Sequence, residues 1–297
     1  MIKFSPSEAA LEGFRLTRER PGTIFGWGVV FAICMFLIGR LMLVSLDPQV
    51  VELTRKKQLD QQDIDQISGL LAQSWPTFLL VLILVTALCS TLTAGIYRLV
   101  LRPEEKGFLH LRLGRDEFRL TALNLLLIAF GMICLTAELA AVAAAGDQGG
   151  LAAIPALVIP LLTIWIGVRL ALATPMTFAE HRLSIRDAWA ASRGKFWPLL
   201  GMIVLAAIFY VMVWLLISII GAALIGLAGG AQALENIGGL SGPAIVGVAL
   251  YVFLQLILQV IQLVMLYAPF AVAYQQVHGD PPANPLRARA ERGQNAG

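Results

Sequence analysis

The chain has 297 residues, of which 58% are hydrophobic and 14% charged, and its mean hydropathy is +0.77. A soluble domain is nearer half apolar and about a quarter charged, so this composition excludes an ordinary soluble protein and indicates surface that faces lipid. Three cysteines and three histidines are too few for a disulfide framework or a finger-type zinc site, and the net charge of +3 is small.

Six apolar stretches are long enough to cross a bilayer as helices, because a hydrocarbon core about 30 Å thick needs roughly 20 helical residues. They cover approximately residues 22–46, 76–101, 121–145, 151–176, 197–228 and 243–275. The last two exceed the needed length, so we expect them to tilt or to protrude into the interface. Gly146–Gly150 predicts a tight turn between the third and fourth stretches.

The sequence therefore predicts an all-α, polytopic membrane protein with six transmembrane helices. A single transmembrane domain is expected over residues 1–279, and a disordered tail over 280–297, which is rich in Pro, Ala and Arg. Pro175 and Pro269 predict kinks near the ends of the fourth and sixth helices, since proline cannot continue the backbone hydrogen bonds of a helix.

A polar, amphipathic segment precedes the first stretch. It begins at Ser5, where Pro6 at the first helical position and Glu8 further on predict a capping box. Similar segments precede the third stretch, at residues 107–120, and the fifth, from about Ser184. The pattern predicts three units, each an interfacial helix followed by a helical hairpin. Alternatively, such loops are commonly basic and amphipathic without forming a repeat.

The segment between the first two stretches, residues 47–75, is charged and rich in glutamine. Ile64, Ile67, Leu70 and Leu71 recur there at helical spacing. This spacing predicts a short amphipathic helix that caps the outer face or meets a partner.

The distribution of Lys and Arg sets the orientation, because loops rich in these residues stay in the cytoplasm. Most of the 22 basic residues precede the first stretch or follow the second, fourth and sixth. The loop after the first stretch holds only Arg55, Lys56 and Lys57, offset by acids such as Asp60 and Asp63. We therefore expect a multi-pass protein of the bacterial inner membrane with both termini in the cytoplasm. The polar N-terminus predicts no removable signal peptide.

Basic side chains of interfacial helices face the phosphates of anionic lipids. We expect such headgroup contacts from Arg15, Arg18, Arg112, Arg115, Arg193 and Lys195. The expected partners are thus anionic membrane lipids, with a protein as a further candidate and no nucleic acid.

Two runs, Leu101–Arg115 (LRPEEKGFLHLRLGR) and Tyr267–Tyr274 (YAPFAVAY), carry a resemblance. The chain resembles bacterial inner-membrane proteins related to the membrane domain of glycerophosphoryl diester phosphodiesterases. In those enzymes the membrane domain precedes a soluble catalytic barrel, and because only a short tail follows the last stretch we expect no such barrel here. The resemblance implies a fold and a lipid-related context, and it supplies no catalytic residues.

Ionisable residues within the stretches are candidates for a site, because placing them in lipid is costly. Arg40 and Glu138 lie at nearly equal depth in the first and third stretches, which permits an ion pair. Such a pair would either hold two helices together or form part of a polar cavity for a head group. Arg169 has no carboxylate at its level, so it is expected to snorkel to the interface or to lie over Tyr267.

The sixth stretch carries a polar stripe. Tyr251, Gln255, Gln259 and Gln262 recur at spacings of four, four and three residues, which places them on one helical face. Their amides suit interhelical hydrogen bonds worth roughly 0.6–2 kcal/mol each. They suit the wall of a hydrated pathway equally well.

The sequence contains no nucleophile–base spacing, no phosphate-cradling glycine loop and no metal-ligand pair, so we expect no catalytic residue, metal or cofactor. The favoured function is a non-catalytic scaffold or accessory factor that organises a partner or anionic lipids. The alternative is a transporter or lipid-handling protein with a polar intramembrane site, although the motif of mitochondrial carriers is missing. A membrane-embedded enzyme is a third possibility, with Glu138 and Glu180 as its only candidate acids.

Overall fold

The computed structural model describes residues 5–54, 60–104, 108–145, 149–227, 229 and 242–278, and all of its regular elements are helices. Six helices are long and apolar enough to cross a membrane, as predicted. They are α2 (Pro21–Ser45), α5 (Trp75–Leu101), α6 (Arg115–Ala145), α7 (Gly149–Arg169) continued by α8 (Ala173–Glu180), α10 (Phe196–Leu227) and α12 (Gly242–His278). Residues 146–148 of the predicted turn and the predicted tail 280–297 lie outside the described residues.

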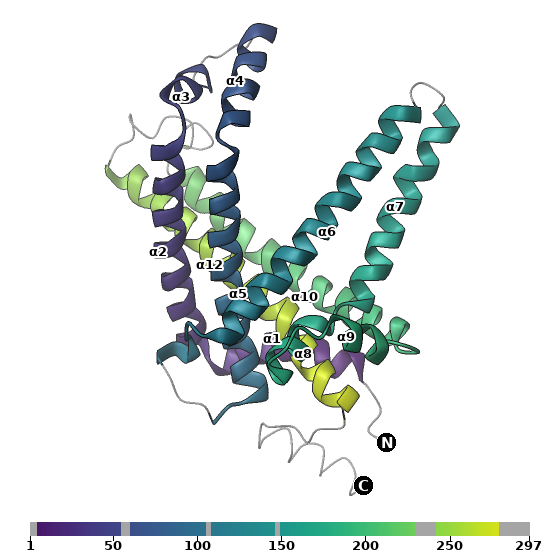
Figure 1. Cartoon of the computed structure of the whole chain (residues 1–297). Coiled ribbons are helices and arrows are strands. Elements are labelled where there is room, and N and C mark those ends of the chain that lie inside the picture. The colour runs from purple at the N-terminus through teal and green to yellow at the C-terminus, as the bar shows by residue number, and fades with distance from the viewer. Residues whose placement is uncertain are drawn as a thin grey trace, which may run out of the picture.

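Shorter helices lie at the two ends of the molecule. They are α1 (Pro6–Glu19), α3 (Pro48–Thr54), α4 (Gln61–Gln73), the 3-10 turn η1 (Phe108–His110) and α9 (Ile185–Ala191). Figure 1 shows α1, α8 and α9 gathered at one end, with α3 and α4 at the other. We call the end that holds α1, η1, α8 and α9 the basic end. The backbone N–H of Ser5 donates to Gln276 Oε1 at 3.1 Å there, which ties the start of α1 to the end of α12.

Helix α1 packs directly against α12 and α10. Its buried side carries Ala9, Ala10, Gly13 and Leu16. A Cβ atom on Gly13 would lie 2.5 Å from the Cα of Met265, so the two backbones touch at a point where only glycine fits. The helix begins at Pro6, as predicted.

The capping box predicted at the start of α1 is wrong. Within the described residues, Ser5 makes no side-chain capping hydrogen bond, and its hydroxyl lies 3.4 Å from the Ser7 hydroxyl instead. The tertiary bond from the Ser5 backbone to α12 fixes this end of the helix in place of a local cap.

The fourth span is broken rather than kinked. Helix α7 ends at Arg169 and α8 begins at Ala173, with turns at residues 170–172. Pro175 has no backbone N–H, and its ring conflicts with the carbonyl of Ala171, so the helix cannot pass through this point unchanged. By contrast, α12 stays helical through Pro269 to His278.

The core lies toward the basic end. Every residue of α5 from Leu92 to Val100 is buried, whereas none from Trp75 to Val85 is. The fully buried Trp27 of α2 donates from Nε1 to the Leu109 carbonyl at 2.8 Å and so anchors η1 to the core. The helices are therefore held together at this end, and their opposite halves are left to face lipid.

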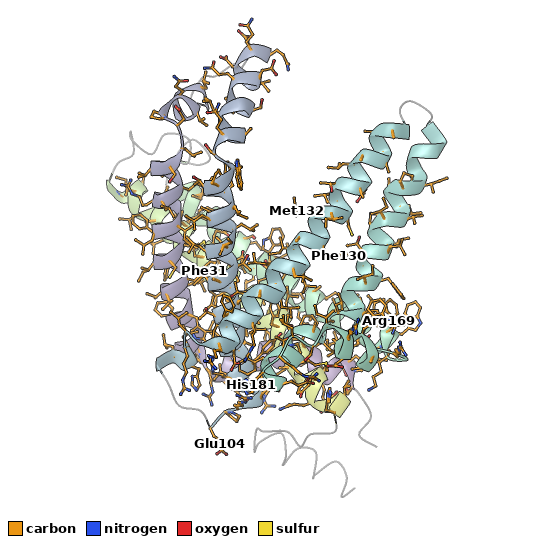
Figure 2. The ribbon with its side chains drawn as sticks, viewed as in Figure 1. Phe31, Glu104, Phe130, Met132, Arg169 and His181 are labelled. Atoms are coloured by element: carbon orange, nitrogen blue, oxygen red, sulfur yellow. The ribbon has the colours of Figure 1, made fainter. Side chains whose placement is uncertain are left out.

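Helices α6 and α7 pack against each other and lean away from α2 and α5 toward the end that holds α4 (Figure 1). No side chain of α6 from Asn124 to Ala144 is buried, and Met132, labelled in Figure 2, is 53% exposed. Helices α10 and α12 run obliquely to α2 and α5 in Figure 1.

Candidate functional site

The ion pair that the depths of Arg40 and Glu138 permit is not formed. Arg40 is exposed on α2 and Glu138 is partly exposed on α6, and neither has an ionic partner within the described part of the chain. In Figure 1, α5 stands between α2 and α6, which lean apart. Equal depth fixes the height of a residue in the membrane but does not make two helices neighbours.

Arg169, the last residue of α7 and labelled in Figure 2, lies against a pair of packed indole rings, Trp165 and Trp189, rather than over Tyr267. Its Cζ is 5.4 Å from the ring centroid of Trp165 and 5.6 Å from that of Trp189 on α9. Its Nε and Nη1 atoms are buried and have no hydrogen-bond partner among the described residues. Two aromatic faces thus stabilise the charge, while hydrogen-bond donors of the guanidinium stay unmet.

The glutamine stripe on α12 serves two different roles. Gln262 Oε1 accepts a hydrogen bond from the Tyr210 hydroxyl of α10 at 3.3 Å, which matches the interhelical role. Gln255 and Gln259 instead line a cavity of about 490 Å³ between α2, α5 and α12, and neither amide has a partner in the described chain. We call this space the glutamine cavity. Its other lining residues are Phe31, Met35, Val85, Cys89, Tyr251, Val252 and Leu256.

The six residues expected to contact lipid headgroups all lie at or beside the basic end. They differ in how exposed they are and in whether an acid of the chain already pairs with them. Arg15 pairs with Glu19 at 2.8 Å and with Glu12 at 3.7 Å. Burial opposes its charge, but the hydrogen bond to Glu19 and the two carboxylates raise the pKa of Arg15 above its usual value. The internal acids therefore compensate this charge.

The remaining members of this set divide by exposure. Arg18, Arg112, Arg115 and Arg193 are exposed, and Lys195 is half-buried. Arg18, Arg115 and Arg193 form no ion pair with any described residue. These three are the most accessible charges for an external anion.

Sequence reasoning missed a buried ion pair between Arg98 of α5 and Glu117 of α6. Their side chains are 6% and 5% exposed. Arg98 Nη1 also donates to the His110 carbonyl at 3.0 Å, and the Gly114 N–H donates to Glu117 Oε2 at 2.9 Å. Arg98 falls inside the predicted stretch 76–101 and Glu117 inside the amphipathic segment 107–120, and no contact between them was predicted. Their places, in the last turn of one span and the first turn of the next, were the available signal that they could meet.

A second set of polar contacts joins α5, α6 and α8 beside this pair. Arg102 Nη2 lies 3.1 Å from His181 Nε2, and His181 Nδ1 lies 2.8 Å from Asp116 Oδ1. Because arginine can only donate, Nε2 accepts and Nδ1 donates to Asp116. The Phe178 ring lies 5.6 Å from Arg98 Cζ and 5.3 Å from Arg102 Cζ. Both ring nitrogens of His181 are occupied, so its role here is to hold the helices together.

Two further cavities open between helices. One, of about 270 Å³, lies where α6 and α7 meet α10 and α12, and its wall includes Asn124, Thr163 and Tyr267. The other, of about 340 Å³, is apolar and lies between α1 and α10, where Leu11 and Phe14 face α10 residues such as Met212. We call the latter the α1 groove.

No protein-family model, curated protein or solved structure matches the chain.

Proposed function

We propose that this integral membrane protein resides in the bacterial inner membrane and organises anionic phospholipids at its cytoplasmic face, without catalysing a reaction. The observation that carries the proposal is the position of Arg169. Its charge lies against the packed rings of Trp165 and Trp189, donors of its guanidinium are unmet, and no described acid pairs with it. Tryptophan rings favour the headgroup level of a bilayer, where a lipid phosphate can supply the missing acceptor.

The rest of the basic end supports the same function. Exposed Arg18, Arg115 and Arg193 would each contribute about 1 kcal/mol of attraction to an anionic surface. On α1, Leu11, Phe14 and Arg18 follow at spacings of three and four residues and share one side of the helix. A lipid chain in the α1 groove would therefore have its phosphate near Arg18.

The proposal includes three further expectations from the sequence. They are the orientation of the chain in the membrane, the three units of interfacial helix plus hairpin, and a lipid-related function. The excess of Lys and Arg on one side favours placing the basic end, with both termini, in the cytoplasm. The segments with α1, η1 and α9 would lie at the headgroups before each pair of spans. The resemblance to the membrane domains of glycerophosphoryl diester phosphodiesterases points to the same lipid surroundings.

Native mass spectrometry of the protein in nanodiscs of mixed phosphatidylglycerol and phosphatidylcholine tests the proposal. We expect wild type to retain phosphatidylglycerol in preference, and Arg169→Gln to lower that retention about fivefold, the equivalent of about 1 kcal/mol. Arg186→Gln is the matched control, because it removes one exposed charge from α9 outside the indole pair, and it should lower the retention less than Arg169→Gln does. Equal retention by wild type and Arg169→Gln would refute the proposed role of Arg169.

A protein partner is the second candidate, favoured by α4. No residue of this helix is buried, and Ile64 on it is 46% exposed at the end opposite the basic end. The helix is locally stabilised, since Asp63 Oδ2 accepts a bond from the Asp60 N–H at 3.3 Å. Replacing Ile64 with a photoreactive residue should crosslink one stoichiometric partner in cells if α4 is a docking helix, and only lipid or itself if it is not.

A further inference from the structure

The glutamine cavity lies near the middle of the membrane. Phe31, labelled in Figure 2, is ten residues from the start of α2 at the basic end, and Val85 is ten residues from the start of α5 at the opposite end. At 1.5 Å per residue each lies about 15 Å from its own end, which is half of a core about 30 Å thick. Neither bulk water nor phospholipid headgroups reside at this depth.

Gln255 and Gln259 bring unpaired amides to this depth. Each amide carries two N–H donors and one carbonyl acceptor, and leaving them unmet in hydrocarbon is costly. Gln262, one turn further along the same helix, has the Tyr210 hydroxyl as its partner. The contrast indicates that the partner of Gln255 and Gln259 comes from outside the described chain.

The lining of the cavity limits what that partner can be. It contains no lysine, arginine, aspartate or glutamate, so nothing there compensates a phosphate or an ammonium group. A charged headgroup also stays at the interface, because moving it to mid-bilayer is costly, whereas a neutral polar group reaches this depth more easily. The volume of about 490 Å³ is within the range of small-molecule sites.

The cavity is accessible from the lipid side. Val252 is 47% exposed and Gln259 is also exposed, although both lie on a membrane-spanning helix. A molecule dissolved in the bilayer can therefore enter between α2, α5 and α12 without crossing the basic end.

We infer that the glutamine cavity binds a neutral lipid whose carbonyl or hydroxyl oxygens meet the amides of Gln255 and Gln259. A diacylglycerol and an isoprenoid quinone share this chemistry, since both carry uncharged carbonyl oxygens on a large apolar body. The site is separate from Arg169 in residues and in ligand charge, so it goes beyond the proposed binding of anionic phospholipids.

The test uses native mass spectrometry of the full chain after addition of dioleoylglycerol or, separately, ubiquinone. Wild type should retain one of the two, which names the source. Gln255→Leu/Gln259→Leu should lower that retention at least about fivefold, as expected for two intramembrane hydrogen bonds. Gln262→Leu is the control, because it removes the same group from the same helix on the side of α10. Failure of wild type to retain either lipid, or equal retention by the double variant, overturns the inference.

A second measurement does not depend on the folding of the double variant. A dioleoylglycerol or ubiquinone analogue, whichever matches the lipid that wild type retains, with a photoreactive diazirine near its carbonyl groups should crosslink wild type within α12 residues 251–259 and the facing parts of α2 and α5. Crosslinks confined to α6 or α7 would overturn the assignment of the site. The phosphatidylglycerol bound to wild type and to Arg169→Gln is read separately, so loss of either site is distinguishable from loss of the other.

Discussion

At the junction of α5 and α6, the buried charges of Arg98 and Glu117 depend on each other. Replacing Glu117 with Gln leaves the guanidinium buried without its counter-charge. We expect the free energy of unfolding to fall by about 3–5 kcal/mol, seen as a lower midpoint of thermal unfolding in detergent.

Glu138→Gln is the control on the same helix, because Glu138 is partly exposed and has no ionic partner in the described chain. We expect it to change stability by no more than about 0.5 kcal/mol. A larger loss from Glu138→Gln than from Glu117→Gln would contradict the assignment of the structural ion pair.

His110 gives the basic end a dependence on pH. Burial, followed by the charges of Arg20, Arg98 and Arg112, lowers the pKa of His110 below the ordinary histidine value. Because the folded protein disfavours protonation, this residue contributes stability above about pH 6.5 that is lost as the pH falls through the lowered pKa.

We therefore expect the ring of His110 to titrate below the free histidine value in an NMR experiment. The thermal midpoint of wild type should fall between neutral pH and about pH 5 more steeply than that of His110→Gln. Titration at or above the ordinary value would show that neither burial nor the neighbouring arginines disfavour the charged form of this ring.

For single residues, the sequence predicted the residue type and its depth in the membrane. It did not predict which neighbouring helix each side chain faces. Gln255, Gln259 and Gln262 share one stripe, yet only Gln262 meets a partner on α10. Gln255 and Gln259 line the cavity beside α2 and α5, although the Gln255 amide also lies close to Gly221 of α10. A periodicity identifies a face but does not identify what covers it.

Among the helices, the contact of α1 with α12 depends on Gly13. Gly13→Ala would place a methyl group against the Met265 backbone, which cannot move aside as a side chain can. We expect α1 to shift or detach, with a lower thermal midpoint and faster proteolysis of the N-terminal segment.

Gly201→Ala on α10 is the matched control, since a Cβ there meets nothing within 4 Å. It should be neutral or stabilising by up to about 1 kcal/mol, because alanine favours a helix over glycine. Equal effects of the two substitutions would show that close packing at Gly13 does not hold α1 in place.

The bounds of most long helices were predictable from hydropathy, because a helix that crosses a membrane must be apolar along most of its length. Helix α5 starts one residue before the predicted span. Helix α6 starts at Arg115, six residues before its predicted span, because Asp116 and Glu117 lower the local hydropathy although acids suit the first turn of a helix. The full break before Ala173 was not predictable in extent, since it depends on how α8 packs against α6 and α9.

The helices of the whole molecule pack together at the basic end and spread apart toward the opposite end. The buried core joins the lower parts of the helices, while α6 and α7 lean away from α2 and α5 (Figure 1). The sequence did not predict this arrangement, because apolar side chains that face lipid and those that face a neighbouring helix are chemically alike. The number of membrane spans can be predicted despite this ambiguity. Which helices lie next to each other cannot, and for this reason the ion pair between Arg40 and Glu138 was wrongly thought possible.

The most direct test of the central proposal is quenching of tryptophan fluorescence by phospholipids brominated near the start of their chains. At equal mole fractions, brominated phosphatidylglycerol should quench wild type more than brominated phosphatidylcholine does. The excess should become smaller in Arg169→Gln and in a variant with Trp165 and Trp189 replaced by Phe. Equal quenching of wild type by the two lipids would contradict a phosphate site at Arg169 and, with it, the proposed organisation of anionic lipids.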